Sequence, residues 1–414
     1  MDDVVIVGGG IGGLALALNL HARGIPCRVF ERAPEVRELG VGITLLPHAM
    51  RELTALGLQA ELLAAGVENR EACFFNRFGQ FIYREARGKF AGYPYPEVGI
   101  HRGRLHRILY RTAVARLGAE RIVTDRSCVE VEQDDASATA RFVQTSTGRD
   151  AAPARARVVV ACDGINSAVR RQFYPGEELA FAGINTWRGV TRREPILDGR
   201  TYLRIGSLLT GKLVIYPIAD AIDAEGRQLV NWMAEIKRDT RIRNDWNKPG
   251  RLADFLPLYE SWRFDWLDVP DMLRAADQVL EYPMVDRDPV ERWTFGRVTF
   301  LGDAAHPMYP RGSNGAAQAL IDARTLADCL HGARDPRAAL ADYERLRRET
   351  TSRIVHTNRT HPPDIINIRV EELVGDRPFD DLDRYITQDE LRALSEHYKQ
   401  VAGFSIADVG ATRR

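Results

Sequence analysis

Residues 3–31, DVVIVGGGIGGLALALNLHARGIPCRVFE, decide the fold of this 414-residue chain. The stretch begins with a short apolar run that is typical of a buried parallel strand. A glycine-rich turn follows, then an apolar helical run that closes at Gly24, and then a second strand-like run that ends on Glu31. This order of elements predicts a βαβ unit of the kind that binds dinucleotides.

The glycines of the turn fit the G-x-G-x-x-G spacing, with Gly8, Gly10 and Gly13 at the fixed positions. The first glycine allows a tight turn, the second lets the backbone approach a pyrophosphate, and the third lets helix and strand pack closely. Glu31 lies where an acid would accept hydrogen bonds from an adenosine ribose. The motif predicts dinucleotide binding, but it does not separate FAD from NAD(P), and no second copy occurs in the chain.

Composition limits the compartment and the partners. Lys+Arg and Asp+Glu both number 57, so the formal net charge is zero, which argues against nucleic acid or an anionic membrane as the main partner. The five cysteines are scattered without C-x-x-C spacing, as in a protein of a reducing compartment, and we expect no metal site. The acidic, glycine-interrupted start does not resemble a signal peptide, and no run reaches the roughly 18 apolar residues of a membrane span. We expect a cytoplasmic protein.

The length suggests two domains. Strand-like segments dominate from about Ala180 to Pro283, which predicts an antiparallel sheet inserted into the nucleotide-binding domain. The C-terminal helices could pack on the same chain or on a second subunit in a homodimer. The expected division is a discontinuous nucleotide-binding domain (1–75, 100–178 and 284–360), a substrate-binding sheet domain (76–99 and 179–283) and a C-terminal helical appendage after the HPPD segment (361–414).

Two further acidic residues follow buried strands. Asp163 lies in VVVACDGINSAVR, and Asp303 begins the stretch GDAAHPMYPRGSNGAAQ at the end of another strand. By themselves these could be an ordinary Asp-Gly turn and an N-cap. However, ligands bind open α/β sheets at the carboxyl ends of the strands. The helix after Asp303 also begins with small residues that leave its backbone N–H groups exposed.

Together the three motifs resemble the class A flavoprotein aromatic hydroxylases, the p-hydroxybenzoate and salicylate hydroxylase family, to about residue 360. The segments LGVGI, TWRGVT, LVNW and YPMVDRDP are most similar to the branch that hydroxylates phenazine carboxylates. The resemblance implies an α/β fold, in which an FAD-binding Rossmann-like domain carries an inserted antiparallel β-sheet substrate domain and C-terminal helices.

The resemblance also implies the chemistry. FAD would be the cofactor, NAD(P)H the transient reductant and O2 the co-substrate. A C4a-hydroperoxyflavin would hydroxylate a small aromatic substrate, a polycyclic or salicylate-like acid, with or without loss of its carboxyl group. Two other readings stay open: an FAD-dependent dehydrogenase that does not use O2, and a non-catalytic flavin-binding redox sensor. Flavin halogenases of this fold carry a W-x-W-x-I-P segment, which this chain lacks.

In this family the stretch after Asp303 would pass under the flavin ring. The N–H groups of Asn314, Gly315 and Ala316 would face flavin N1 and O2, where the reduced ring is negative and a helix N-terminus is favourable. The residues implied for FAD are Gly8, Gly10, Ile11, Gly12, Gly13, Glu31, Arg32, Val41, Gly42, Arg102, Val129, Asp163, Gly302, Asp303, Pro310, Gly312, Asn314, Gly315 and Ala316.

The inserted sheet would provide the roof of the substrate pocket. Tyr216 and Tyr309 are candidates to hydrogen-bond a substrate hydroxyl. Arg311 stands where many relatives carry a small or apolar residue, and it could bind a substrate carboxylate or face solvent. These three are the catalytic candidates, whereas His306 is usually structural in relatives. The residues expected around the substrate are Trp187, Arg188, Tyr216, Tyr282, Met284 and Pro307, most of which could instead be core residues.

Overall fold

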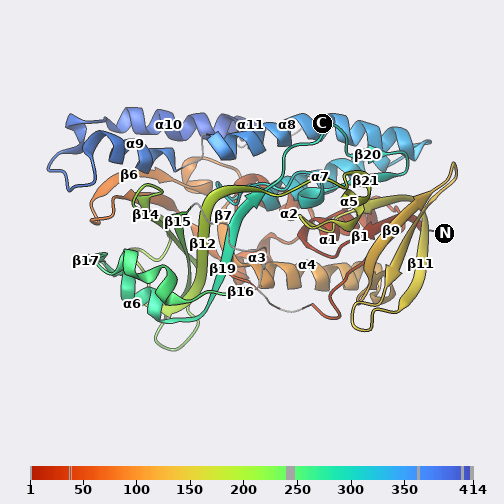
Figure 1. Cartoon of the computed structure of the whole chain (residues 1–414), viewed down its shortest axis with the longest axis horizontal. Coiled ribbons are helices and arrows are strands. Elements are labelled where there is room, and N and C mark those ends of the chain that lie inside the picture. Colours follow the sequence, from red (N-terminus) through yellow and green to blue (C-terminus); the bar gives the residue numbers. More distant parts are fainter. Residues whose placement is uncertain are drawn as a thin grey trace.

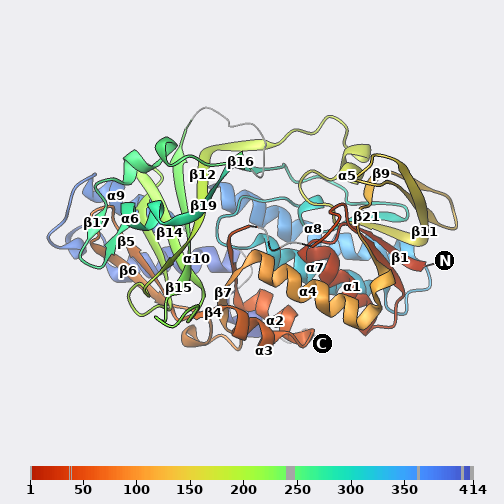
Figure 2. The ribbon, with the colours of Figure 1, turned by 90° about the horizontal axis from the view of Figure 1, so that it is seen from below.

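The computed structural model describes residues 2–36, 38, 40–238, 248–360, 364–401 and 405–410. Two eight-stranded sheets lie at opposite ends of the molecule, and the C-terminal helices form a layer that runs along both (Figure 1). A three-stranded sheet lies between the two large ones (Figure 2). The predicted α/β architecture with an inserted antiparallel sheet is confirmed.

The first sheet is parallel at its centre, in the order β20-β21-β11-β1-β2-β8. Strand β1 pairs in parallel with β11 on one side and with β2 on the other, while β9 and β10 extend β11 as an antiparallel meander. The strands are β1 (Asp2–Val7), β2 (Cys27–Phe30), β8 (Ile122–Val123), β9 (Ser127–Gln133), β10 (Ala138–Val143), β11 (Asp150–Ala161), β20 (Thr294–Phe295) and β21 (Val298–Phe300).

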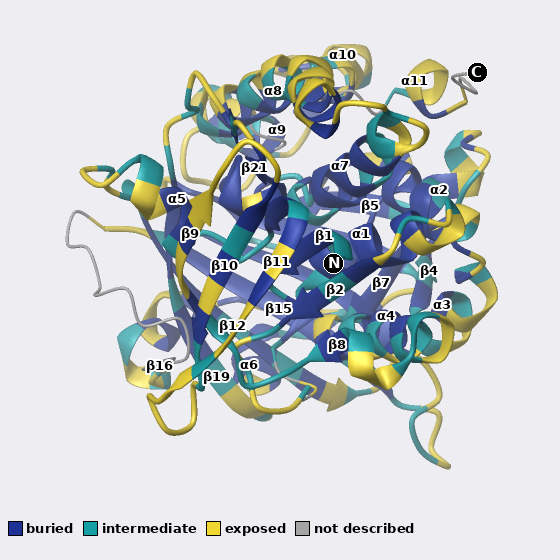
Figure 3. Ribbon diagram, turned by 90° about the vertical axis from the view of Figure 1, so that its right-hand side faces the viewer, coloured by how far each residue is buried: buried dark blue, intermediate teal, exposed yellow. Residues whose placement is uncertain are grey.

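Helices bury this parallel centre, which is the largest part of the core (Figure 3). Val4–Val7 are at most 3% exposed, as expected for an apolar run at the centre of a parallel sheet. Helix α1 packs against both α7 and α4, and α7 packs against α8. The helices of this domain are α1 (Ile11–Ala22), α4 (Arg102–Leu117), α5 (Ala168–Phe173), α7 (Gly315–Leu330) and α8 (Pro336–Thr360).

The second sheet has the order β16-β19-β12-β15-β14-β13-β5-β6, and its neighbours are antiparallel except for the pair β13–β5. One of its faces is closed by a cluster of buried rings, Trp187, Trp232, Phe255 and Trp262, together with helix α6 (Val269–Arg274) and the β17–β18 hairpin (Arg263–Phe264 and Leu267–Asp268). Its strands are β5 (Glu71–Phe75), β6 (Phe81–Ala86), β12 (Ala180–Arg193), β13 (Thr201–Ser207), β14 (Gly211–Ala219), β15 (Gln228–Lys237), β16 (Lys248–Pro249) and β19 (Ala276–Asp286).

Two edges of this sheet differ from the expected domain division. The predicted hairpin turn forms, but the boundary after residue 75 separates its strands β5 and β6, which pair with each other in this sheet. Strand β19 also continues to Asp286. The sequence identified the hairpin by its local pattern, whereas the sheet it joins is set by the distant partner β13.

The small sheet β3-β7-β4 joins the two large parts. Strand β7 contacts β14 of the second sheet, and the Gly42 N–H donates to Asn231 Oδ1 at 2.7 Å. A Cβ atom at Gly42 would lie 2.7 Å from Asn231, so the two parts meet here too closely for a side chain. The elements are β3 (Gly42–Leu45), β4 (Val67–Asn69), β7 (Glu97–His101), α2 (Pro47–Ala55) and α3 (Gln59–Ala65).

The C-terminal appendage packs on the second sheet of the same chain. Helix α9 (Ile365–Val374) contacts β13 and β5, and α10 (Gln388–Val401) contacts β6, α8 and α9. The short α11 (Ile406–Gly410) reaches α2. Asp364 forms buried ion pairs with Arg204 and Lys212, each at 2.8 Å. The rest of the HPPD segment, residues 361–363, lies outside the described residues.

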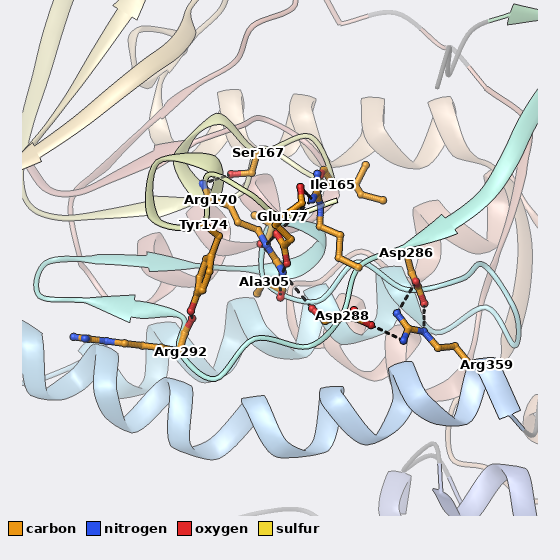
Figure 4. A network of polar contacts seen from close by, with 12 residues as sticks. Ile165, Ser167, Arg170, Tyr174, Glu177, Asp286, Asp288, Arg292, Ala305 and Arg359 are labelled. Carbon is orange, nitrogen blue, oxygen red and sulfur yellow. Dashed lines mark hydrogen bonds and ion pairs between the residues drawn. The ribbon is translucent and has the colours of Figure 1, made fainter. Parts of the chain in front are cut away.

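A polar network fastens the place where the chain returns from β19 to the first domain (Figure 4). Arg359 on α8 makes a two-pronged contact with Asp286, both distances 2.8 Å, and also pairs with Asp288 at 2.7 Å. Between these acids, Arg287 donates to the Ile165 carbonyl at 3.1 Å. The segment YPMVDRDP therefore forms the junction between the two domains.

Within the described ranges, no helix is both long and apolar enough to cross a membrane.

We expect Arg359→Gln to destabilise the junction by about 2 to 3 kcal/mol, because it leaves the Asp286 carboxylate buried without its cation. The Asp286 side chain is 0% exposed. The midpoint of thermal unfolding measures the change. Arg392→Gln is the control, because the Arg392–Asp389 pair is solvent-exposed and such pairs contribute about 0 to 1 kcal/mol. Equal midpoints for the two variants would contradict the expectation.

Candidate active site

The glycine turn after β1 has two kinds of glycine. Gly8 has φ +106°, and a Cβ there would lie 2.4 Å from the Cys162 carbonyl oxygen. A Cβ at Gly13 would lie 2.0 Å from the Gly8 carbonyl oxygen, so both positions are fixed by backbone packing. Gly10 differs, because nothing lies within 4 Å of its Cβ position and it begins α1 without a side-chain cap. The turn thus presents open backbone at Gly10, and no side chain caps the first N–H groups of α1.

Glu31 lies against this turn, as the motif predicts. One carboxylate oxygen accepts a hydrogen bond from Gly9 N at 2.7 Å and the other from Ala33 N at 2.8 Å. His106 on α4 also contacts the Gly9 carbonyl oxygen at 2.6 Å. The neighbouring Arg32 is exposed, and Ile11 is half-buried at the start of α1. The acid at the end of β2 therefore holds the turn in shape and lies at its edge.

Asp163 carries an unsatisfied buried atom. Its Oδ2 accepts from Ala168 N at 2.8 Å, whereas its Oδ1 is buried and has no hydrogen-bond partner within the described part of the chain. Burial raises the pKa of this carboxyl group, against the hydrogen bonds that lower it. A buried acceptor without a donor is costly in a folded protein, so this atom indicates a ligand that brings a donor.

Asp303 follows Gly302, whose φ of +62° makes a sharp bend after β21. The Asp303 side chain keeps access to solvent, although much protein lies around it. This burial raises the pKa of its carboxyl group, while His306 and Arg102 act in the opposite direction. Arg102 is itself exposed at the start of α4. Arg102 therefore lies near enough to act on the charge of Asp303.

His306 belongs to the buried framework behind the site. Its Nε2 contacts Asp322 Oδ2 at 2.5 Å, and Arg347 Nε donates to Asp322 Oδ1 at 2.7 Å. Gly302 N also donates to this carboxylate, at 3.2 Å. Burial alone would raise the pKa of Asp322, but His306 and Arg347 lower it to about 2. The fully buried Asp322 thus anchors the segment that carries Asp303.

The loop before α7 presents its backbone. Gly312 and Ser313 both have positive φ, +72° and +57°. Asn314 then starts α7 without a side-chain cap, and Gly315 and Ala316 are half-buried. The first N–H groups of α7 therefore have no partner from a capping side chain. Pro310 is exposed and Pro307 is buried in the same stretch.

The inner face of the second sheet brings several predicted substrate residues together. The Arg188 guanidinium lies over the Tyr282 ring at 5.4 Å, and its Nε is buried without a hydrogen-bond partner among the described atoms. Tyr216 stacks on Tyr202 with centroids 5.1 Å apart, and burial raises the pKa of the Tyr216 hydroxyl. Arg188 lies close enough to lower the pKa of both Tyr216 and Tyr282, although burial outweighs it.

A second apolar group adjoins this face. Met284 and Tyr309 are buried together with Ile184 and Leu208. Burial raises the pKa of the Tyr309 hydroxyl to about 12. Tyr309 therefore packs at the edge of the sheet beside the loop that leads to α7.

Two expected residues point elsewhere. Trp187 is 0% exposed and stacks on Phe255 at 5.2 Å, on the sheet face opposite to Arg188, because successive residues of a strand alternate between faces. Arg311 does not face solvent, since it is 8% exposed and its Nε lies 3.6 Å from Asp364. The Asp364 carboxylate beside Arg311 is shared with Arg204 and Lys212. Trp187 therefore takes the core position that the sequence left open, and a role for either residue in the site stays a prediction.

The remaining residues predicted to bind FAD lie on or beside β3, α1 and β9. Val41 is buried directly before β3, and Gly42 contacts the second sheet as described above. Gly12 lies against α7, where its Cβ position is 3.4 Å from the Ala319 Cβ atom. Val129 is 53% exposed on β9.

Several residues that the sequence did not single out contact the segments that carry the candidate site. Asn231 lies in the LVNW segment and holds Gly42, and Arg170 donates to the carbonyls of Ala304 and Ala305 at 3.0 and 2.8 Å. His48 and Tyr398 both contact Asn314. The segments containing Asn231 and Arg170 were noticed as motifs, whereas nothing local distinguishes His48 or Tyr398.

A family profile and two related proteins all point to an FAD-dependent enzyme. The family profile described as an FAD binding domain matches residues 1–194 and 271–358. The phenazine 1,6-dicarboxylic acid hydroxylase PhzS of Lysobacter antibioticus is 42% identical over 362 residues, which cover 86% of this chain and 89% of that protein. The 3-amino-4-hydroxybenzoate 2-monooxygenase PtmB3 of Streptomyces platensis is 33% identical over 357 residues, 83% of each chain.

Solved structures share the fold. A salicylate hydroxylase in complex with its substrate superposes with a TM-score of 0.74 at 19% identity, and the match covers 99% of this chain and 98% of that one. HpxO of Klebsiella pneumoniae, complexed with FAD and uric acid, gives a TM-score of 0.74 at 21% identity, with 98% and 96% covered.

The chain therefore belongs to the FAD-binding family of flavoprotein monooxygenases, as its three motifs indicated. Within this family it is a class A FAD-dependent aromatic hydroxylase, which uses NAD(P)H and O2. The site fits the cofactor. The open backbone at Gly10, the unsatisfied Asp163 Oδ1 and the uncapped start of α7 are three features that a bound dinucleotide and its flavin ring would satisfy.

We expect Gly10→Ala and Gly13→Ala to separate a cofactor-binding glycine from a structural one. Gly10→Ala fits its backbone conformation, so the apoprotein should keep its stability or gain about 0.5 kcal/mol, while FAD affinity falls at least tenfold. Gly13→Ala should destabilise the apoprotein itself, because its Cβ meets the Gly8 carbonyl. Thermal unfolding without FAD and FAD titration measure the two effects, and equal behaviour of the variants would contradict this assignment.

We expect Asp303→Asn to stabilise the apoprotein at neutral pH. Because the native pKa of Asp303 is raised above the ordinary value of 3.8, the native state binds the proton more tightly than the unfolded state, and ionisation costs stability. The gain should shrink as pH falls through the raised pKa toward 3.8. Unfolding midpoints between pH 8 and pH 4 test this, with the exposed Asp277→Asn as the control. A gain that is independent of pH would contradict it.

Proposed function

We propose that this hydroxylase acts on an aromatic carboxylic acid of the phenazine or salicylate type. The two curated relatives reported above are named for a phenazine dicarboxylic acid and an amino-hydroxybenzoate. The single observation that carries the proposal is Arg188, whose buried Nε has no acceptor among the described residues and whose guanidinium lies over the Tyr282 ring. A carboxylate supplies that acceptor, because guanidinium groups bind carboxylates through parallel hydrogen bonds.

The cofactor would be held by the residues that meet in the first domain. The turn of Gly8, Gly10 and Gly13 and the N-terminus of α1 would bind the pyrophosphate, with Glu31 beside the ribose. Asp163 would accept a hydrogen bond near the pyrophosphate and Asp303 one from the ribityl chain of FAD. Arg102 would approach the cofactor from the start of α4. When bound, FAD supplies the reduction by NAD(P)H and the activation of O2 that hydroxylation requires.

The N-terminus of α7 would stabilise negative charge on the reduced ring. Its N–H groups at Asn314, Gly315 and Ala316 are left without a side-chain cap, and the helix dipole favours an anion at this end. A bulky residue in this turn would keep the ring away, which accounts for the small side chains there.

The second sheet would position the substrate and exclude water. Arg188 would orient the carboxylate, and the rings of Tyr216 and Tyr282 would contact the aromatic system. Because burial raises the pKa of Tyr216, and that of Tyr309 to about 12, both hydroxyls stay protonated at neutral pH. They can therefore donate a hydrogen bond to a substrate oxygen, but they do not act as general bases.

The test is to purify the protein, record its visible spectrum and follow NADH and NADPH oxidation with salicylates and phenazine carboxylates. Flavin bands with substrate-stimulated oxidation and a hydroxylated product are expected, and the product mass shows whether the carboxyl group is lost. Bound FAD without stimulation by any aromatic acid would favour the dehydrogenase or redox-sensor reading. Failure to bind added FAD would overturn the proposal.

We expect Arg188→Met to raise the KM for carboxylate substrates by about tenfold to a hundredfold, since a charge-assisted hydrogen bond contributes about 1.5 to 3 kcal/mol. The matching carboxamide should show little difference between wild type and variant. Arg192→Met is the control, because Arg192 lies on the same strand but is exposed. Equal KM changes for carboxylate and carboxamide would remove Arg188 from the substrate site.

We also propose a cytoplasmic location. The cysteines at 27, 73, 128, 162 and 329 are all free thiols, as expected in a reducing compartment. A homodimer stays a prediction, and light scattering on the purified protein checks it.

A further inference from the structure

A directed chain of side-chain hydrogen bonds runs behind the loop that leads to α7. His48 Nε2 on α2 contacts Asn314 Oδ1 at 3.0 Å, and Asn314 Nδ2 donates to the Tyr398 hydroxyl at 3.3 Å. The Tyr398 hydroxyl donates to Asn358 Oδ1 at 3.2 Å, and Asn358 Nδ2 donates to the Tyr309 carbonyl at 3.4 Å. Each member except Tyr309 contributes its side chain, so the chain ties both ends of the loop to α2, α8 and α10.

The members of this chain are almost fully buried. His48 and Asn314 are 1% exposed, Asn358 is 0% and Tyr398 is 4%. Burial lowers the pKa of His48 to about 3, against the hydrogen bond to Asn314 that raises it. His48 is therefore neutral at physiological pH, and its Nε2–H serves as the donor to Asn314 Oδ1. A buried hydrogen-bonded network of this kind specifies one arrangement of the groups it joins.

The loop needs such support because its backbone is unusual. Ser313 has φ +57°, a region that a residue with a side chain adopts only when its surroundings hold it there. The preceding Gly312 leaves space for the tyrosine, since a Cβ atom at Gly312 would lie 1.7 Å from the Tyr398 hydroxyl oxygen. The C-terminal helix thus fits directly against the loop.

We propose that Tyr398 is a positioning residue of the active site: through Asn314 and Asn358 it fixes the loop so that the N-terminus of α7 faces the flavin. This inference rests on the proposed role of α7 in stabilising the reduced ring. Tyr398 lies outside residues 1–194 and 271–358, which the FAD-binding profile matches. The C-terminal appendage therefore contributes to cofactor chemistry as well as to packing on the second sheet.

The reason for a functional effect is geometric. Backbone donors stabilise developing negative charge only when they point at it, and a small displacement loses much of the gain. Removing the Tyr398 hydroxyl leaves Asn314 Nδ2 and Asn358 Oδ1 without that partner in a buried place and frees the loop to relax. Reduced flavin should lose more binding free energy than oxidised flavin, because the reduced ring carries the negative charge.

The test compares the FAD-loaded full-length wild type, Tyr398→Phe and Tyr83→Phe. Tyr83 is an equally buried tyrosine on β6 beside the same helices, and its hydroxyl makes no hydrogen bond to a described residue. The readout is the midpoint potential of bound FAD from a dye-linked titration, with thermal unfolding as a check on folding.

Tyr398→Phe should bind FAD but prefer the reduced form about threefold to tenfold less, which lowers the two-electron potential by about 15 to 30 mV. Tyr83→Phe should leave the potential unchanged. Hydrogen peroxide formed per NAD(P)H consumed should also rise in Tyr398→Phe alone.

An unchanged potential in a folded, FAD-loaded Tyr398→Phe would overturn the inference and leave the proposed function intact. A wild type that binds no FAD would overturn both. If Tyr398→Phe does not fold, Asn358→Ala removes the next member of the chain and carries the same expectation.

Discussion

The site depends on how closely helices α1 and α7 pack. A Cβ atom at Gly12 of α1 would already lie 3.4 Å from the Ala319 Cβ atom of α7, and one at Gly302 would lie 3.1 Å from that same atom. Only small residues allow this approach, and it brings the first turns of both helices to the same end of the parallel sheet. Both helices begin without a side-chain cap, so a single extended anionic cofactor would satisfy the first N–H groups of both.

Around the two helix starts, buried ion pairs connect segments that lie far apart in the sequence. Asp322 holds the segment of Asp303, and Asp286 ties the returning strand β19 to α8. Asp364 joins the C-terminal helices to the second sheet. Each carboxylate is nearly inaccessible and has an arginine beside it, so each joint is costly to break but adds little net stability over an apolar contact. Buried ion pairs of this kind are best suited to places where two segments must keep a fixed relative position.

The sequence predicted the features that short stretches encode. The turn from Gly8 to Gly13 and its acid Glu31 are spelled out within one βαβ unit, and the acids after β11 and β21 follow from their strands. The face of a strand is harder to predict when both faces are buried, which is why the pattern left Trp187 of β12 open between the core and the substrate pocket. The burial of Arg311 could not be predicted because its neighbour Asp364 comes from the C-terminal appendage. His48 and Tyr398 meet at Asn314 only in the folded chain, and no local pattern marks them.

The hydrogen bond between Tyr398 and Asn314 joins residues that are synthesised at different times, so it can form only after Tyr398 has been made. Helix α10 leaves the ribosome after both nucleotide-facing helix starts, because it follows them in the chain. The dinucleotide turn can form as soon as its βαβ unit is complete, but the loop at 309–314 lacks a support until residue 398 has emerged and docked. A chain that stops before residue 398 would therefore hold the adenosine end of the cofactor better than its ring.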